Sequence, residues 1–160
     1  MIGEKIQNDL KAAMKSGDAL RLSTLRMAQS AIHNKALEKR AALVKAGGAA
    51  EETVLTDDEI ISVLKTEVKR RKEASAEFKK GNRKELAEKE QKEAIILGAY
   101  LPAEADDAVL EEAAKAAVAE IGTDPKQFGR VMGLAMKKLA GKASGERVSE
   151  VVRRLLGEAS

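Results

Sequence analysis

Residues 56–81 read TDDEIISVLKTEVKRRKEASAEFKKG, and this stretch predicts one long helix. It opens with Thr56, whose hydroxyl can accept from the third amide of the helix while Glu59 reaches back to the first. The acids between them favour the positive end of a helix dipole. The inward stripe that follows comprises Ile60, Ile61, Leu64, Val68, Ser75 and Phe78, and Gly81 ends it. Spacings of three and four residues indicate an amphipathic helix with one buried face.

The same helical punctuation appears on both sides of this stretch. Upstream, Gly17 ends one apolar stripe, and Asp18 can cap the helix that follows. Downstream, Asn82 with Glu85 repeats the capping pattern and opens a helix that stops before Pro102, because proline disfavours helical geometry in the preceding residue. No stretch alternates as a strand does. We therefore expect an all-α protein.

Pro102 also marks the predicted boundary between two domains. Residues 1–101 are expected to form an N-terminal helical bundle of about four helices, and residues 102–160 a small C-terminal domain of three helices. In the second part, the cap and proline of Asp124-Pro125 open one helix, and a glycine-bounded turn precedes the last. Three helices over about 60 residues make a feasible domain.

The composition excludes most catalytic and metal-binding chemistry. The 160 residues include no Cys and a single His, His33, so a disulfide scaffold, a thiol nucleophile and a Cys-built or His-built metal site are excluded. No phosphate-binding loop, serine-nucleophile motif or zinc-protease motif occurs. We therefore expect no catalytic residues, no cofactor and no metal, and a chain that does not catalyse a reaction by itself.

The sequence gives no indication of a membrane protein. The longest apolar run, residues 94–101, is far shorter than the ~20 residues that a membrane span requires. The first residues lack the apolar segment of a secretion signal. We therefore expect a cytoplasmic protein with no membrane partner.

The net charge of +3 conceals an uneven distribution along the chain. Residues 1–93 carry 20 basic and 16 acidic side chains, residues 94–121 carry one and six, and residues 122–160 carry eight and four. The three segments therefore have net charges of +4, −5 and +4. An acidic segment separates two basic ones, and an anionic partner is expected to dock on a basic one.

The first basic surface lies on the long helix of residues 56–81. At about 100° per residue, one flank of this helix carries Lys65, Lys69, Lys72 and Lys80. Acidic residues occur elsewhere on the same helix, so the surface is mixed. A solvated helix with many ion pairs is the favoured interpretation, and contact with phosphate or an acidic partner is the alternative.

The second and sharper candidate surrounds the turn of residues 141–145, which reads GKASG. Glycines allow a ligand to approach the backbone, and amides at the start of the next helix point towards such a ligand. The RNA-binding candidates are Arg130, Lys137, Lys138, Gly141, Lys142, Gly145, Arg147, Arg153 and Arg154. A plain connection between helices, with lysines that complement the helix dipole, explains the same spacing equally well.

Two further features bear on this candidate. Gly129 and Gly133 lie four residues apart on the preceding helix, where close helix packing is the favoured explanation and a flat contact surface for a partner is the alternative. With one Tyr, two Phe and no Trp, the chain offers no platform for stacking single-stranded bases. Contact with RNA is therefore expected to involve the backbone and shape of a folded RNA, with a strong salt dependence.

Seven stretches, in this order, resemble the YqeY proteins, the stand-alone members of the GatB/YqeY group. They are residues 9–15 (DLKAAMK), 21–26 (RLSTLR), 31–34 (AIHN), 69–73 (KRRKE), 100–102 (YLP), 129–133 (GRVMG) and 141–145 (GKASG). The last two, with residues 148–152 (VSEVV), resemble the C-terminal tail of the B subunit of tRNA-dependent amidotransferases. The chain departs from the family pattern at Lys137, where members often have proline, and at Ser144, where they often have an acid.

This resemblance implies two all-α domains and a tail that helps to hold tRNA, while the amidation chemistry resides elsewhere in that enzyme. It also associates the chain with carbon–nitrogen ligases that use glutamine as amido donor, although only the tail of the enzyme is resembled. We therefore predict a non-catalytic helical adaptor that binds tRNA or assists a tRNA-amidating or aminoacylating enzyme. The alternatives are a protein–protein interaction module with no nucleic-acid role and, third, amidotransferase activity within a larger complex.

Overall fold

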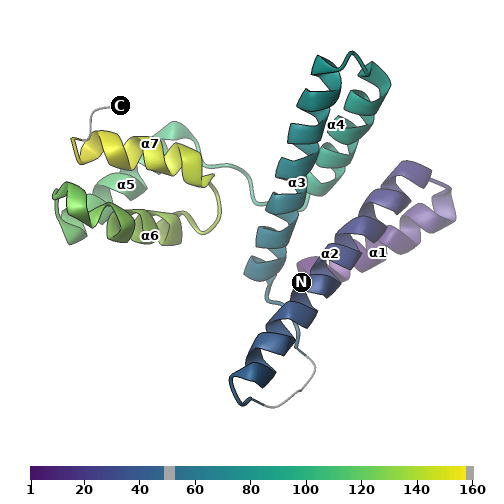
Figure 1. Ribbon diagram of the computed structural model, residues 1–160, viewed down its shortest axis with the longest axis horizontal. Coiled ribbons are helices and arrows are strands. Elements are labelled where there is room, and N and C mark those ends of the chain that lie inside the picture. The colour runs from purple at the N-terminus through teal and green to yellow at the C-terminus, as the bar shows by residue number, and fades with distance from the viewer. Residues whose placement is uncertain (49–52, 158–160) are drawn as a thin grey trace. The chain divides into compact units, whose positions relative to one another are not determined.

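The computed structural model describes residues 1–48 and 53–157, and every regular element in those two ranges is a helix. The predicted all-α class is therefore confirmed (Figure 1). Internal contacts divide the chain into two compact units, Met1–Leu101 (unit 1) and Pro102–Ser160 (unit 2). Residues 158–160 of the predicted C-terminal domain lie outside the described part. No helix within the described ranges combines the length and the apolar character that crossing a membrane requires.

Unit 1 consists of two helical hairpins, each made of helices that are consecutive in the sequence (Figure 1). Its helices are α1 (Ile2–Ser16), α2 (Ala19–Lys45), α3 (Asp57–Lys80) and α4 (Lys84–Gly98). The buried side chains between them are Ile6, Leu25, Ala28, Leu55, Ile60, Leu64, Val68, Ala94, Leu97 and Tyr100. Because each of these helices contributes to the cluster, the two hairpins share one core.

The start of α3 agrees with the sequence prediction. Oγ1 of Thr56 accepts from the Glu59 amide at 3.3 Å, and the Glu59 carboxylate accepts from the Thr56 amide at 2.7 Å. The same carboxylate meets Nζ of Lys39, on α2, at 2.8 Å. The hydrogen bond with Lys39, followed by that with the Thr56 amide, lowers the pKa of Glu59 below its ordinary value. The capping box therefore also ties α3 to α2.

The start of α4 differs from the prediction, which assigned a helix cap to Asn82 and Glu85. Asn82 has a left-handed backbone conformation (φ 57°), and its amide donates to the carbonyl of Lys79 at 3.1 Å. The amide of Arg83 donates to the carbonyl of Phe78 at 2.8 Å. These two bonds close the end of α3 as a Schellman motif. Asn82 therefore ends one helix, and α4 begins without a side-chain cap.

In residues 102–157, unit 2 forms three α-helices, one of which is preceded by a short 3₁₀ turn. The elements are α5 (Asp107–Ile121), η1 (Pro125–Gln127), α6 (Phe128–Leu139) and α7 (Gly145–Leu155). Side-chain oxygens of Asp106, Asp124 and Ser144 cap α5, η1 and α7. The core is built from Ala105, Leu110, Ala114, Ala117, Val131, Ala135, Leu139, Ala143, Val148, Val152 and Leu156. The share of α6 in this core fixes which of its faces points outward.

Candidate nucleic-acid interface

The turn between α6 and α7 is held from two sides. Ala140 and Gly141 both have left-handed backbone conformations, with φ of 45° and 78°, which glycine adopts without strain. The amide of Lys142 donates to the carbonyl of Leu139 at 2.9 Å, and its own carbonyl accepts from the amide of Ala105. The Lys142 residue is exposed. A fixed backbone therefore carries an exposed ammonium group.

The amides at the start of α7 are partly used by the chain itself. Oγ of Ser144 accepts from the Arg147 amide at 3.4 Å. This amide is therefore already used by the chain, contrary to the prediction that the first amides of this helix point towards a ligand. Apart from its chain neighbours and the backbone of α7, no heavy atom of residues 1–48 and 53–157 lies within 4 Å of the place that a Cβ on Gly145 would occupy. Packing within this chain therefore does not require glycine at that position, and the close approach of a ligand to Gly145 stays a prediction.

Three of the candidate cations are neutralised by carboxylates of the acidic segment. The pairs are Lys138 with Glu120 at 3.3 Å, Arg147 with Asp107 at 2.8 Å and with Glu104 at 3.4 Å, and Arg154 with Glu111. We call Lys138, Arg147 and Arg154 the paired set. Exposed ion pairs add little to stability, but each one lowers the positive potential that an anion would meet. The acids of residues 94–121 therefore reduce the number of cations that unit 2 offers to an anion.

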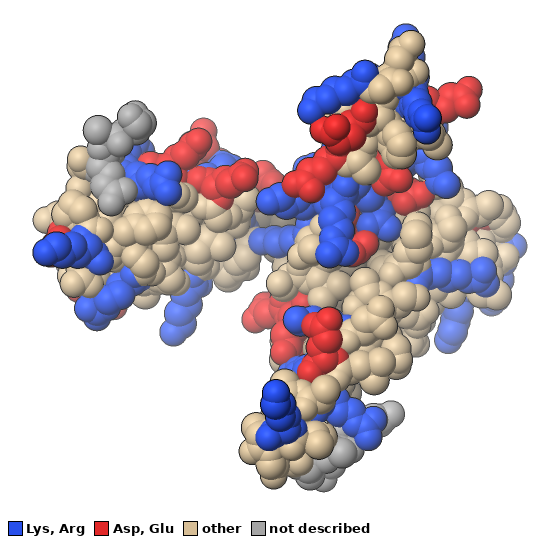
Figure 2. All heavy atoms as spheres, in the orientation of Figure 1, with Lys and Arg blue, Asp and Glu red and all other residues tan. Residues whose placement is uncertain are grey.

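Three other cations lie on the outward face of α6 and in the turn. Arg130 donates to the neutral Oε1 of Gln127 at 3.3 Å, and the ion pairs of the described residues do not include Lys137 or Lys142. Arg130 and Lys137 are seven residues apart, so they share one face of α6 and lie about 10 Å apart along its axis. We call Arg130, Lys137 and Lys142 the open set. Figure 2 shows basic side chains standing out from the side of unit 2 where α6 lies.

The close packing favoured for Gly129 and Gly133 is wrong within the described chain. Both residues are exposed, and no heavy atom lies within 4 Å of a Cβ placed on either. The physical reason is that α6 packs through its opposite face, which carries Val131 and Ala135. The alternative, a flat contact surface for a partner, stays a prediction. This surface lies on the same side of α6 as Lys137.

The aromatic side chains do not offer an open stacking platform. Phe128 is half-buried, and the Arg153 guanidinium lies 5.5 Å from the centre of its ring. Phe78 is half-buried and Tyr100 is 7% exposed. Arg153 is therefore engaged in a cation–π contact, and the basic surface of unit 2 suits phosphate groups better than bases.

On α3, carboxylates form ion pairs with Lys69 and Lys80, which belong to the predicted secondary basic face. The pairs are Lys80 with Glu77 at 2.8 Å and Lys69 with Glu73 at 4.0 Å. The hydrogen bond with Glu77 raises the pKa of Lys80. Lys65 is half-buried and Lys72 is exposed. These contacts favour the interpretation of α3 as a solvated helix with many ion pairs.

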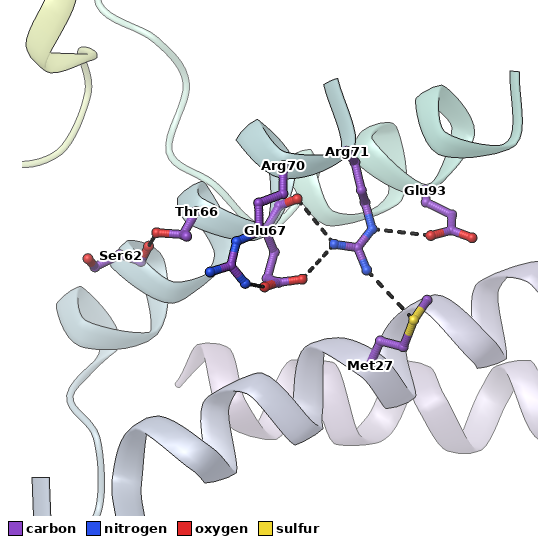
Figure 3. A network of polar contacts seen from close by, with 7 residues as sticks. All are labelled: Met27, Ser62, Thr66, Glu67, Arg70, Arg71 and Glu93. Carbon is purple, nitrogen blue, oxygen red and sulfur yellow. Dashed lines mark hydrogen bonds and ion pairs between the residues drawn. The ribbon is translucent and has the colours of Figure 1, made fainter. Parts of the chain in front are cut away.

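A buried polar network that we did not predict from the sequence joins α3 to α4 and α2 (Figure 3). The Arg71 side chain is 7% exposed, and its Nε donates to Oε2 of Glu93 at 3.2 Å. Its Nη1 donates to Oε2 of Glu67 at 2.6 Å, and its Nη2 lies 4.0 Å from Sδ of Met27. The sequence does carry an indication. Arg71 follows buried Val68 by three residues and Glu67 by four, a spacing typical of a buried pair on one helix face.

A second polar cluster joins α1 and α2 to the end of α4. The Tyr100 hydroxyl donates to Oδ2 of Asp9, and Nη2 of Arg21 lies 4.0 Å from the same oxygen. Nζ of Lys5 lies 5.4 Å from the centre of the Tyr100 ring. Burial, then the hydrogen bond to Asp9 and the charge of Asp9, raise the pKa of Tyr100 to about 12. The phenol therefore stays a donor at neutral pH and anchors α4 to α1.

The groups on these surfaces are suited to binding. In residues 1–48 and 53–157, no three His, Cys, Asp or Glu side chains gather where they could hold a metal ion. The open set instead offers three cations on a helix and a fixed turn, an arrangement that fits the repeated charges of a polyanion.

Comparison with known proteins decides the family. A family model described as YqeY-like protein matches residues 3–156. The chain belongs to the YqeY-like family. The resemblance that we based on seven stretches is therefore confirmed. In this YqeY-like chain, the match spans the turn, the open set and both polar networks of unit 1.

Two fungal relatives add little about activity. The YqeY-like chain is 27% identical over 157 residues to "Altered inheritance of mitochondria protein 41, mitochondrial" of Pyrenophora tritici-repentis, which covers 96% of this chain and 80% of that protein. It is 41% identical over 54 residues to "Uncharacterized protein C22F3.15" of Schizosaccharomyces pombe, covering 34% of this chain and 44% of that protein. The first name places that fungal protein in mitochondria, so a cytoplasmic location for this chain stays a prediction.

Proposed function

We propose that this YqeY-like protein is a non-catalytic adaptor that holds tRNA through unit 2. The observation that carries this proposal is the separation of the cations into two sets. Carboxylates of the acidic segment neutralise the paired set, whereas the open set presents its charges from one helix face and the adjoining turn. A surface of exposed cations on a helix and a fixed turn suits the phosphate backbone of a folded RNA.

The expected mode of binding follows from the side chains available. Lysine and arginine contacts to phosphate release counterions, so affinity should fall steeply with salt. The rings of Phe78, Tyr100 and Phe128 are at least half-buried, so base stacking should contribute little. The protein should therefore distinguish folded tRNA from an unstructured single strand by backbone shape, with little preference among tRNA sequences.

Partner enzymes enter this proposal through the resemblance to the amidotransferase tail. In an adaptor of this kind, unit 2 holds tRNA while a tRNA-amidating or aminoacylating enzyme performs the chemistry. The carbon–nitrogen ligase activity associated with the wider group would then belong to that partner. Purified chain mixed with glutamine, ATP and misacylated tRNA should form no amidated product, and product formation by the chain alone would contradict the proposal.

The decisive experiment compares two triple variants by fluorescence anisotropy with labelled bulk tRNA. One variant carries Arg130→Gln, Lys137→Gln and Lys142→Gln, and the other carries Lys138→Gln, Arg147→Gln and Arg154→Gln. Both remove three positive charges, so their net charges are equal. We expect the open-set variant to lose most binding and the paired-set variant to keep most of it. Equal losses, or no tRNA binding by the unaltered protein at low salt, would contradict the proposal.

The cytoplasm is the compartment we propose for this function. A tRNA adaptor acts where tRNA is charged, and the cytoplasm is such a compartment. Fractionation of the source cells with an antibody against the chain tests this location. Recovery mainly from an organelle fraction would contradict it.

A further inference from the structure

A polar groove runs between α2 and α3 in unit 1, and none of its lining residues belongs to the open or the paired set. It is lined by side chains from residues 26–38 of α2 and from residues 62–70 of α3. The lining residues recur at spacings of one, three and four, so each helix contributes one continuous stripe. The stripe on α2 covers about 18 Å of helix axis, which is more than three turns.

Two contacts join α2 to α3, one at each end of the groove. At one end, Sδ of Met27 lies 4.0 Å from Nη2 of Arg71 (Figure 3). At the other, Nζ of Lys39 meets the Glu59 carboxylate at 2.8 Å. A low residue number on α2 therefore faces a high one on α3, and the two helices run antiparallel. The groove lies between the Met27–Arg71 contact and the Lys39–Glu59 ion pair.

Several of the side chains that line the groove are short. They include Ser30 and Ala31 of α2 and Ser62 and Thr66 of α3. Oγ of Ser30 donates to the carbonyl of Arg26 at 3.1 Å, and Oγ1 of Thr66 donates to the carbonyl of Ser62 at 3.1 Å. Each of these hydroxyls uses its proton within its own helix, so its oxygen remains as an acceptor.

The charges of the groove are unequal at its two ends. Near Lys39, Nζ of Lys35 forms an ion pair with Oε2 of Glu38 at 3.0 Å. Near Arg71, Arg70 and Arg71 share one carboxylate of Glu67, and the ion pairs of the described residues do not include Arg26. The end formed by Arg26 and Arg70 is therefore positive, while the rest is neutral.

We propose that this groove receives a helix of a second protein through a mainly polar face, and that this helix carries an Asp or Glu that pairs with Arg26. The length of the groove matches about three helical turns, and its acceptor oxygens suit Ser, Asn or Lys side chains of a partner. Glu38 and Glu67 also line it, which makes it unsuitable for an RNA backbone. Its apolar contribution is limited to Met27, Ala31 and Val63, so the interface is small and the complex exchanges readily.

The test uses the full-length protein with a photoreactive residue in the groove. Cells express the variant Ser62→p-benzoylphenylalanine, and a matched variant places the same residue at Lys11, which is exposed on α1. After irradiation, the crosslinked peptides are sequenced by mass spectrometry. We expect Ser62 alone to crosslink to one protein, within a helix that carries an acid about two to three turns from the crosslinked residue, because Ser62 and Arg26 lie towards opposite ends of the groove.

The identified partner is then purified and titrated against charge variants. Arg26→Glu should weaken its binding about fivefold to tenfold, because it replaces attraction by repulsion at the positive end. Lys11→Glu makes the same change in charge outside the groove and should leave the affinity unchanged. Replacement of the partner's acid by Lys should restore binding to the Arg26→Glu variant, which a merely destabilised protein could not show.

Four outcomes would overturn the proposal: no crosslink beyond that of the Lys11 control, a crosslink to RNA, a crosslink to a second copy of this chain, or failure of the charge exchange to restore binding. The inference is independent of tRNA binding. The open-set variant should keep the Ser62 crosslink, and Arg26→Glu should keep tRNA affinity. Loss of tRNA binding alone therefore contradicts the proposed function and leaves the groove assignment intact.

Discussion

Nε of Arg71 donates to Oε2 of Glu93 at 3.2 Å, and these two side chains are only 7% and 4% exposed. Their helices are consecutive in the sequence, and the pair lies where α3 and α4 face α2. Glu67 accepts from the same guanidinium at 2.6 Å. One arginine therefore donates to carboxylates from two helices inside the bundle. Removal of either partner should lower the free energy of unfolding more than removal of a partner in a surface pair would.

Removal of Glu93 should destabilise unit 1 strongly. Glu93→Ala leaves a buried guanidinium with one partner fewer, and breaking a buried pair costs about 3–5 kcal/mol in the free energy of unfolding. Glu73→Ala removes the acid of an exposed pair with Lys69 and should cost less than about 1 kcal/mol. Urea unfolding followed by Tyr100 fluorescence reports on unit 1, because the chain has one Tyr and no Trp.

A double variant separates the loss of the pair from the loss of packing. Arg71→Met with Glu93→Leu replaces the charges by apolar groups and should recover most of the stability lost in Glu93→Ala. A Glu93→Ala protein no less stable than Glu73→Ala would show that water reaches the pair freely.

Tyr100 should titrate late in the folded protein. Its pKa is raised to about 12, first by burial and then by the hydrogen bond to Asp9 and the charge of Asp9. The ultraviolet absorbance of the ionised phenol, followed during an alkaline titration, measures this pKa directly. Asp9→Asn should lower this pKa only in part, because burial is the larger cause. A midpoint at about 10, the value of an exposed tyrosine, would contradict the observed contact.

The same shift makes unit 1 less stable in alkali. The unfolded chain releases the tyrosine proton near pH 10, whereas the folded chain holds it until about pH 12. Above pH 10 the unfolded state therefore binds fewer protons, and the contribution of Tyr100 to stability, complete below pH 10, is lost as the pH rises towards 12. In Tyr100→Phe this part of the pH dependence should be missing from urea midpoints measured across that range.

Freeing the paired cations should strengthen tRNA binding. Glu111→Gln with Glu120→Gln releases Arg154 and Lys138 from their partners. The slope of log affinity against log salt should become steeper by about 0.7–0.9 for each additional phosphate that the protein neutralises. Anisotropy titrations at several salt concentrations give this slope.

The control for this prediction is a variant with the same change of charge in the same unit. Glu146→Gln with Glu150→Gln alters two acids of α7 that do not take part in the ion pairs described for the paired set. It should change the slope less than the first variant does. Equal slopes for the two variants would mean that total charge, rather than the release of particular cations, governs binding.

Gly133→Ala should stabilise unit 2 and weaken tRNA binding. Among the described residues, an added Cβ meets nothing within 4 Å beyond its chain neighbours and the backbone of α6 itself, and alanine is favoured over glycine inside a helix by about 1 kcal/mol. Slower amide hydrogen exchange in α6 should report the gain. If RNA approaches the outward face of α6, the methyl group should also reduce affinity. Greater stability with unchanged affinity would exclude this face from the interface.

Local side-chain chemistry made much of the fold predictable. Thr56 and Glu59 form the predicted capping box, and Asp18 accepts from the Arg21 amide at 3.0 Å as expected. Asn82 was assigned wrongly, because asparagine suits both a helix N-cap and a left-handed C-terminal position. The choice between them depends on the bonds to preceding carbonyls, which the local pattern of residue types does not contain.

The candidate site was predictable in its residue types and unpredictable in its pairing. Periodicity locates Arg130 and Lys137 on one helix face, since they belong to one element. It cannot tell that Arg147 meets Asp107, because forty residues separate them and the contact depends on how α5 packs beside α7. The sequence therefore indicated the cations as a group, while tertiary packing decided which of them remain open.

Gly129 and Gly133, both exposed on the outward face of α6, can be compared with the same positions in orthologues. Alanine at 129 or 133 would fit this domain without a clash, so folding alone gives natural selection no reason to retain glycine there. Orthologues from thermophilic organisms are the most informative, because selection for stability there should replace a glycine by alanine wherever no other role retains it. Persistence of both glycines in such species would mean that something external presses against the helix in life.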